Sequence, residues 1–157
     1  MWHFAYGSNL NKRDLDAWCD EKGLPRLNLK DKTWKLAALH DYALVFDCFS
    51  RRRNCVAANI QPSQGELVRG VAFELTQDEF TTITRKEGAP KTYTEIIVEL
   101  GLEYGSTLRA RTFRCRLGTE HPGSLPSRPY LTLIIEGATD HGLDPAWLAK
   151  LRTFPTT

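Results

Sequence analysis

The sequence predicts an α+β fold that forms one domain over residues 1–157. Strand-like runs are grouped in the middle of the chain, and helix-like segments lie on either side of them. This order is typical of α+β proteins and not of a parallel α/β array, in which strands and helices alternate. A chain of 157 residues suits one domain, since it buries roughly two thirds of the surface that its unfolded form exposes.

The N-terminal elements are expected to be a short strand and a helix. Residues 2–6 (WHFAY) are aromatic and stop at Gly7, which is typical of a buried strand. Over residues 11–23 the apolar positions recur at helical spacing, and Gly23 with Pro25 beyond it supplies the stop signal. Residues 24–33 are mixed in character and are expected to form a loop.

The central part of the chain predicts the sheet. Residues 34–50 carry two apolar stretches interrupted at His40-Asp41, which fits either one long bent strand or two strands. Residues 54–63 and 67–76 flank Gln64-Gly65-Glu66, and this pattern predicts a hairpin. Residues 93–101 and 107–116 alternate around the segment 103–106 and predict a second hairpin.

The remaining segments predict three helices and a loop. Residues 78–87 begin with an acidic turn and end before Gly88, which predicts a short helix. Residues 120–129 contain three prolines and are expected to form a surface loop of the kind that covers functional sites. Residues 129–142 fit a strand by composition and a helix by apolar spacing, and we favour the helix. Asp144 and Pro145 then supply the cap and first position of a last helix.

Composition and charge narrow the classes of partner. A net charge of +2 provides no strong field for nucleic acid or an anionic membrane, so neither is expected as a partner. No apolar run approaches the ~18 residues that a membrane span requires. The N-terminus lacks the pattern of a signal peptide, and we therefore expect a cytoplasmic protein.

Neither the cysteines nor the histidines show a ligand pattern. The four cysteines are far apart in sequence and include no C-x-x-C, so free thiols are expected. The four histidines lack metal-ligand spacing, and no metal site is predicted.

Arg51-Arg52-Arg53 is the one concentrated basic run. It fits a solvated loop tip between two strands. It also fits the rim of a site that attracts an acidic substrate, and the sequence leaves both interpretations open.

The segment Tyr6-Gly7-Ser8-Asn9-Leu10 joins the first strand to the first helix. Ser8 or Asn9 could simply cap that helix. Alternatively, the exposed N–H groups at a strand-to-helix turn could bind a small anion such as a carboxylate. The segment matches neither G-x-S-x-G nor the phosphate loop, so a serine nucleophile or a triphosphate site is not indicated.

These residues resemble a known family. The stretch FAYGSNL is similar to the substrate-binding loop of the γ-glutamylcyclotransferases, in which a strand ends in Y-G-S-N-L. Other branches of the fold have Y-G-T-L or Y-G-S-L there, so this loop points to the γ-glutamyl peptide branch. Further segments resemble the family in the family's order: ALHDYALVFD, VAANIQPSQGELVRGVAFELT, Lys86-Glu87-Gly88 followed by Tyr93, and PSRPYLTLIIEGATDHGLDPAWLAKL.

The resemblance implies a small mixed β-barrel with peripheral helices and an enzyme that needs no cofactor. Family members release 5-oxoproline from γ-glutamyl peptides, because the α-amine of the substrate attacks its own γ-carbonyl. The enzyme then has only to fold the substrate, stabilise the oxyanion and move protons. A small γ-glutamyl molecule is thus the expected partner, bound by a monomer or a homodimer.

The resemblance also assigns the site residues. Glu87 corresponds to the carboxylate that moves the protons; Glu136-Gly137 offers a second Glu-Gly pair, but at a place where the family pattern has no acid. The residues expected to bind the substrate are Tyr6, Gly7, Ser8, Asn9, Leu10, Tyr93 and Tyr130. Two alternatives stay open: the same ring closure on a γ-glutamylamine or a γ-glutamyl-protected intermediate, and a non-catalytic module that binds a metabolite.

Overall fold

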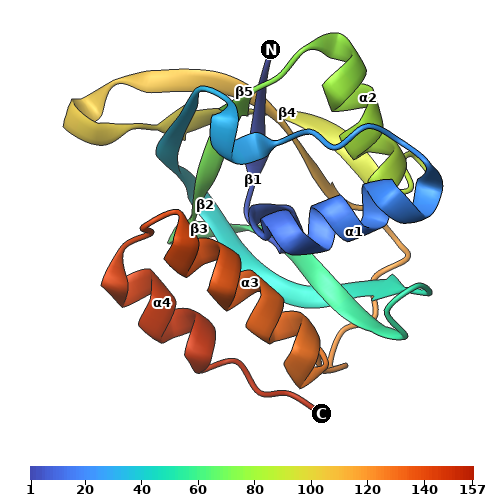
Figure 1. Ribbon diagram of the computed structural model, residues 1–157. Coiled ribbons are helices and arrows are strands. Elements are labelled where there is room, and N and C mark those ends of the chain that lie inside the picture. Colours follow the sequence, from blue (N-terminus) through green and yellow to red (C-terminus); the bar gives the residue numbers. More distant parts are fainter.

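The computed structural model describes residues 1–157 and contains a closed five-stranded barrel with helices around it (Figure 1). The strand order is β1-β3-β2-β4-β5, and β1 closes the barrel by pairing parallel with β5 while every other pair is antiparallel. The strands are β1 (Trp2–Ala5), β2 (Trp34–Ser50), β3 (Cys55–Glu74), β4 (Tyr93–Gly101) and β5 (Thr107–Cys115). The α+β class and the mixed barrel are therefore confirmed.

Four α-helices and three 3-10 turns surround the barrel. The helices are α1 (Lys12–Lys22), α2 (Gln77–Lys86), α3 (Arg128–Asp140) and α4 (Pro145–Arg152), and the turns are η1 (Ser8–Leu10), η2 (Leu29–Asp31) and η3 (Glu103–Gly105). Figure 1 shows α3 and α4 side by side against β2 and β3, with α2 at the opposite end of the molecule. None of these helices is both long and apolar enough to cross a membrane.

Of the two longest strands, β2 fits one of the two alternatives that the sequence left open, and β3 differs from the prediction. β2 is one strand that bends at Asp41, where φ is 63°. β3 runs unbroken through Gln64-Gly65-Glu66, so the hairpin predicted at that segment is wrong. The pairing passes from His40 with Leu67 to Tyr42 with Pro62, and Ser63–Glu66 form a bulge opposite Asp41.

The turn residues of this segment bend β3 without reversing it. Gly65 has a φ of 86°, and its N–H donates to Asp41 Oδ1 at 2.9 Å. The partner strand thus holds the glycine conformation inside a bulge instead of at a hairpin tip. The reversal lies at residues 51–54, between β2 and β3, where the arginine run is found.

The other predicted elements are confirmed. The second hairpin forms from β4 and β5 around η3, and residues 128–140 form a helix. Thr76 and Glu79 form a reciprocal capping box at the start of α2, and Asp144 caps α4 through the N–H of Ala146. These local signals begin the helices where the sequence placed them.

A single apolar core fills the barrel and continues under the helices. Its fully buried side chains come from the strands and from all four α-helices; they include Phe4, Leu15, Ile60, Val71, Phe73, Ile83, Leu100, Ile134 and Leu151. The four cysteines are buried and free.

Helix α3 packs backbone to backbone against η1. A Cβ added at Gly137 would lie 2.5 Å from the carbonyl carbon of Leu10 and 2.7 Å from the nitrogen of Asn11. Asn11 also donates from Nδ2 to the carbonyl oxygen of Leu133 at 3.0 Å. Only glycine at position 137 lets the helix approach this closely, and the approach fixes the loop that follows β1.

Gly137→Ala should therefore destabilise the fold by about 1–3 kcal/mol, because the added methyl group would force α3 and η1 apart. Chemical denaturation should show a lower midpoint than in the parent protein. Thr139→Ala, at an exposed position on the same helix, should change the midpoint far less. Equal midpoints for the two variants would contradict the close packing.

His3 is a buried titratable group in the barrel. Its ring lies 5.9 Å from the rings of both Phe80 and Phe113, and Nδ1 lies 3.2 Å from the carbonyl oxygen of Arg111. Nε2 is buried without a hydrogen-bond partner. Burial lowers the pKa of His3 from 6.5 to about 4, against the opposing effect of the Arg111 carbonyl.

This pKa predicts a loss of stability in acid. Between pH 6.5 and 4, His3 is protonated in the unfolded chain and neutral in the folded chain. The free energy of unfolding therefore falls as the pH falls. From pH 7 to pH 5 the loss due to His3 should be about 2 kcal/mol. Urea titrations at both pH values should show this part of the loss in the parent protein and not in His3→Leu. His121→Gln, at an exposed histidine, should behave as the parent does.

Candidate active site

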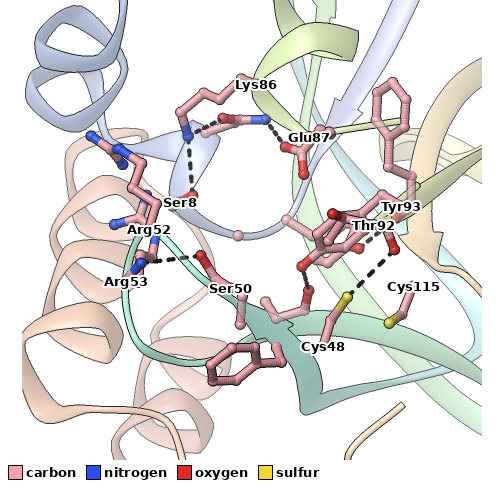
Figure 2. A pocket seen from close by; sticks show the side chains of 18 of the residues that line it. Ser8, Cys48, Ser50, Arg52, Arg53, Lys86, Glu87, Thr92, Tyr93 and Cys115 are labelled. Carbon is pink, nitrogen blue, oxygen red and sulfur yellow. Dashed lines mark hydrogen bonds between the residues drawn. The ribbon is translucent and has the colours of Figure 1, made fainter. Parts of the chain in front are cut away.

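One cavity of about 500 Å³ opens at an end of the barrel (Figure 2). Its walls come from the end of β1 and η1, the turn between β2 and β3, the segment between α2 and β4, and the start of α3. The predicted site residues that line it are Tyr6, Gly7, Ser8, Asn9, Glu87, Tyr93 and Tyr130. The structure thus brings together residues from four distant parts of the chain.

Leu10 does not line the cavity, contrary to the prediction that it binds substrate. Its side chain is 1% exposed and belongs to the core. The reason is the 3-10 turn, which directs Ser8 and Asn9 to the cavity and Leu10 inward. Leu10 instead supplies the backbone against which Gly137 packs.

The loop after β1 is not a simple helix cap. Asn11 caps α1, because its side chain accepts from the N–H of Asp14 at 3.0 Å, so the capping role foreseen for Ser8 or Asn9 is wrong. The backbone N–H groups of Gly7, Ser8 and Asn9 donate to no acceptor within the protein. They are available to an oxygen-bearing ligand.

Gly7 leaves room for such a ligand. A Cβ at this position would lie 3.2 Å from the Cβ of Ala58 and 3.8 Å from the hydroxyl oxygen of Tyr130. A side chain here would press on the cavity wall and occupy space beside the tyrosine.

Asn9 links an acid to a base across the cavity wall. Its Nδ2 donates to Glu87 Oε1 at 2.6 Å, and its Oδ1 accepts from Lys86 Nζ at 2.9 Å. These two hydrogen bonds place the Asn9 amide between the side chains of Lys86 and Glu87. Figure 2 shows the second carboxylate oxygen of Glu87 directed into the cavity. That oxygen has no hydrogen-bond partner in the protein and is free to meet a substrate.

Glu87 is placed by the end of α2. It follows the last residue of the helix, and Gly88 has a φ of 62°, so the chain turns away and leaves the carboxylate at the cavity wall. Burial raises the pKa of Glu87 above its ordinary value, against the opposing effects of the Lys86 ammonium and the Asn9 amide. A carboxyl group with a raised pKa is better suited to exchanging protons near neutral pH.

Lys86, Asp14 and Arg53 complete the site; the sequence assigned no role to Lys86 or Asp14 and left the role of Arg53 open. Lys86 Nζ lies 3.4 Å from Asp14 Oδ2, and Arg53 holds both oxygens of Asp14 at 3.1 and 2.7 Å. Although burial alone would raise the pKa of Asp14, Arg53 and Lys86 hold it below its ordinary value. Burial lowers the pKa of Lys86, while Asp14 and Glu87 oppose that change.

The signals for these residues were present but weak. Lys86 directly precedes the predicted catalytic glutamate, and Asp14 resembles an ordinary acid in the first turn of a helix. Arg53 belongs to the run that fitted both a loop tip and a site rim. The structure places all three of its arginines at the cavity, with Arg53 partly buried and Arg51 and Arg52 exposed.

Three buried tyrosines form the inner wall. Tyr6 donates its hydroxyl proton to the carbonyl of Phe113 at 2.5 Å, and Tyr93 donates to the carbonyl of Ala58 at 2.6 Å. The Tyr130 oxygen instead accepts from the N–H of Ala58 at 2.9 Å. Burial raises the pKa of each of the three, so they stay neutral.

Their hydrogen bonds leave different groups for a ligand. Tyr6 and Tyr93 have used their protons and present acceptor oxygens, whereas Tyr130 keeps a proton that it can donate. The cavity thus offers acceptors suited to an ammonium group and donors suited to oxygens.

Glu136 lies away from this cavity. Its carboxylate is half-exposed and pairs with Arg13 at 3.1 Å and with Asn11 Nδ2 at 3.3 Å. It faces the outer surface of α1 and α3, so only one of the two Glu-Gly pairs supplies an acid to the site.

Comparisons with known proteins agree with this architecture. The model of the AIG2-like family matches residues 67–151, which is more than half of the chain. The chain is 28% identical over 159 residues to mouse gamma-glutamylcyclotransferase, and the alignment covers 96% of this chain and 76% of the mouse protein. Human gamma-glutamylcyclotransferase is 25% identical over 158 residues, with the same coverage of 96% and 76%.

A solved structure named gamma-glutamyl cyclotransferase superposes with a TM-score of 0.83 over 100% of this chain and 89% of that chain. Its sequence is 23% identical, so this likeness concerns the fold alone. The family model, the relatives and the barrel together lead to one conclusion: the chain belongs to the AIG2-like family and has the γ-glutamylcyclotransferase fold.

Proposed function

We propose that this protein is a γ-glutamylcyclotransferase that releases 5-oxoproline from γ-glutamyl amino acids or peptides. The names of its relatives support a cyclotransferase in general. One observation carries the more specific proposal: a carboxylate of raised pKa, Glu87, lies at the wall of the cavity that is also lined by Gly7, Ser8 and Asn9, whose N–H groups have no partner within the protein.

The reaction needs no nucleophile from the protein. The substrate α-ammonium loses a proton, its nitrogen forms a C–N bond to the γ-carbonyl carbon, and the amide C–N bond to the leaving amine breaks. The attacking nitrogen loses a second proton as the lactam forms, and the leaving nitrogen gains two protons and departs as an ammonium. The unpartnered N–H groups of η1 and the Tyr130 hydroxyl are suited to stabilising the oxyanion and binding the substrate carboxylate. The acceptor oxygens of Tyr6 and Tyr93 are suited to the ammonium.

Glu87 would carry the proton in both directions. A glutamate near pKa ~4.3 is a weak base toward an ammonium near ~8, and the gap of about four units corresponds to ~5 kcal/mol. Burial of Glu87 narrows this gap. Its free oxygen can take a proton from the attacking nitrogen as general base and deliver it to the leaving nitrogen as general acid, once for each of the two protons transferred.

Glu87→Gln should reduce the rate of 5-oxoproline formation from γ-glutamyl-alanine by about 10²- to 10⁴-fold, because the amide cannot take up the proton. The rate is measured by mass spectrometry with purified protein. Glu136→Gln is the matched control, since it changes the other Glu-Gly pair and should keep the parent rate. Unchanged activity in Glu87→Gln would refute the assigned role.

The Lys86 ammonium should set the acid limb of the pH profile. Glu87 must be ionised to act as a base, so kcat/KM should rise with pH through the pKa of this group. Lys86→Met removes the charge that opposes the rise of that pKa, and the limb should move to higher pH. Lys86→Arg keeps the charge and should stay closer to the parent profile. A limb at the same pH in Lys86→Met would contradict the coupling.

A further inference from the structure

The mouth of the cavity differs in charge from its interior. Among the lining residues the only carboxylate is Glu87, whereas the cations are Arg51, Arg52, Arg53, Lys86 and Lys91. A ligand that enters this cavity therefore meets an excess of positive charge, and the position of that excess bears on which substrates are accepted.

The inner charges balance one another. Arg53 is paired with Asp14, and Lys86 lies near Asp14 and is joined to Glu87 through Asn9. When both acids are ionised, the two cations match the two carboxylates. The excess of positive charge therefore lies outside this group, at the mouth.

Arg51, Arg52 and Lys91 form what we call the cationic rim. All three are exposed; Arg51 and Lys91 take part in no ion pair, and Arg52 lies 3.6 Å from Glu21, a contact between two exposed side chains that is weak. The rim thus has charges that a ligand can use.

The turn that bears the two rim arginines is held in place. Within it the N–H of Asn54 donates to the carbonyl of Arg51 at 3.3 Å, and the N–H of Arg53 donates to Ser50 Oγ at 3.3 Å. The Arg53 guanidinium lies 4.9 Å from the centre of the Tyr130 ring and grips Asp14 of α1. Figure 2 shows Arg52 and Arg53 on the same side of the cavity as Lys86.

The rim faces the part of the substrate that leaves. This step rests on the proposed function: with the γ-carbonyl near Glu87 and η1, the amine half of the substrate extends toward the mouth. We propose that the cationic rim makes the protein selective for γ-glutamyl dipeptides whose leaving residue has an acidic side chain. The leaving residue of every γ-glutamyl dipeptide has one α-carboxylate, so a second carboxylate on that residue is the feature that distinguishes the class.

γ-Glutamyl-glutamate and γ-glutamyl-glutamine test this selectivity, because they have nearly the same shape and differ by one charge. At low salt kcat/KM should be about five- to tenfold higher for γ-glutamyl-glutamate, with the difference mainly in KM, because the rim lies outside the reacting centre. The preference should shrink as ionic strength rises, since exposed charges are screened. Release of the free amino acid is followed together with 5-oxoproline.

The double variant Arg51→Gln with Lys91→Gln should lose most of the preference, because kcat/KM should fall more for γ-glutamyl-glutamate than for γ-glutamyl-glutamine. Arg152→Gln removes an exposed cation far from the cavity and should keep the preference. Equal kcat/KM for the two dipeptides, or a preference that survives in the double variant, would overturn the inference while the cyclotransferase activity stands. Absence of 5-oxoproline from both dipeptides would overturn the proposed function and this inference with it.

Discussion

The side-chain amide of Asn9, held between the carboxylate of Glu87 and the ammonium of Lys86, is the contact on which the site depends. An amide presents a donor and an acceptor on one rigid plane, so it satisfies both charges at once. Without it Lys86 would lose its contact at 2.9 Å, and Glu87 would lose its only hydrogen bond from a side chain in the protein. A buried carboxylate or ammonium without a partner destabilises the folded protein, because it has lost its hydration.

This contact joins three elements that are remote in sequence. The 3-10 turn places Asn9, the end of α2 places Lys86 and Glu87, and α1 contributes Asp14. Arg53 then ties the turn between β2 and β3 to the same group. A single balanced cluster of charges thus holds together the walls of the cavity. At this end of the barrel, ion pairs and hydrogen bonds join the elements in place of apolar packing.

Capping and turn residues in the sequence predicted most of the helices and strands, but they did not predict which strands pair. The acidic first turn of α2, the cap at Asp144 and the stop at Gly23 lie where the sequence placed them. Gly65 was misread, because the same residues serve a turn or a bulge and only the partner strand, through Asp41, decides between them. The expectation of a barrel came from the family resemblance. Its closure through β1 and β5 was not predicted, since periodicity carries no information on which strands pair.

The site was predicted to a similar degree. The resemblance supplied Glu87, the loop and the tyrosines, and all of them except Leu10 line the cavity. Lys86 and Asp14 were not predicted and the role of Arg53 was left open, because each is an ordinary residue in its own segment and acquires a role only through neighbours far along the chain.

The close approach of Gly137 to Leu10 has a consequence for the entropy of binding. A loop that must order itself around a ligand loses conformational freedom at that moment, and the loss weakens affinity. Here α3 already presses on the turn in the free protein, so its N–H groups are fixed before a ligand arrives. The C-terminal helices, which contribute few side chains to the cavity, thereby act as a brace that keeps the binding loop preorganised.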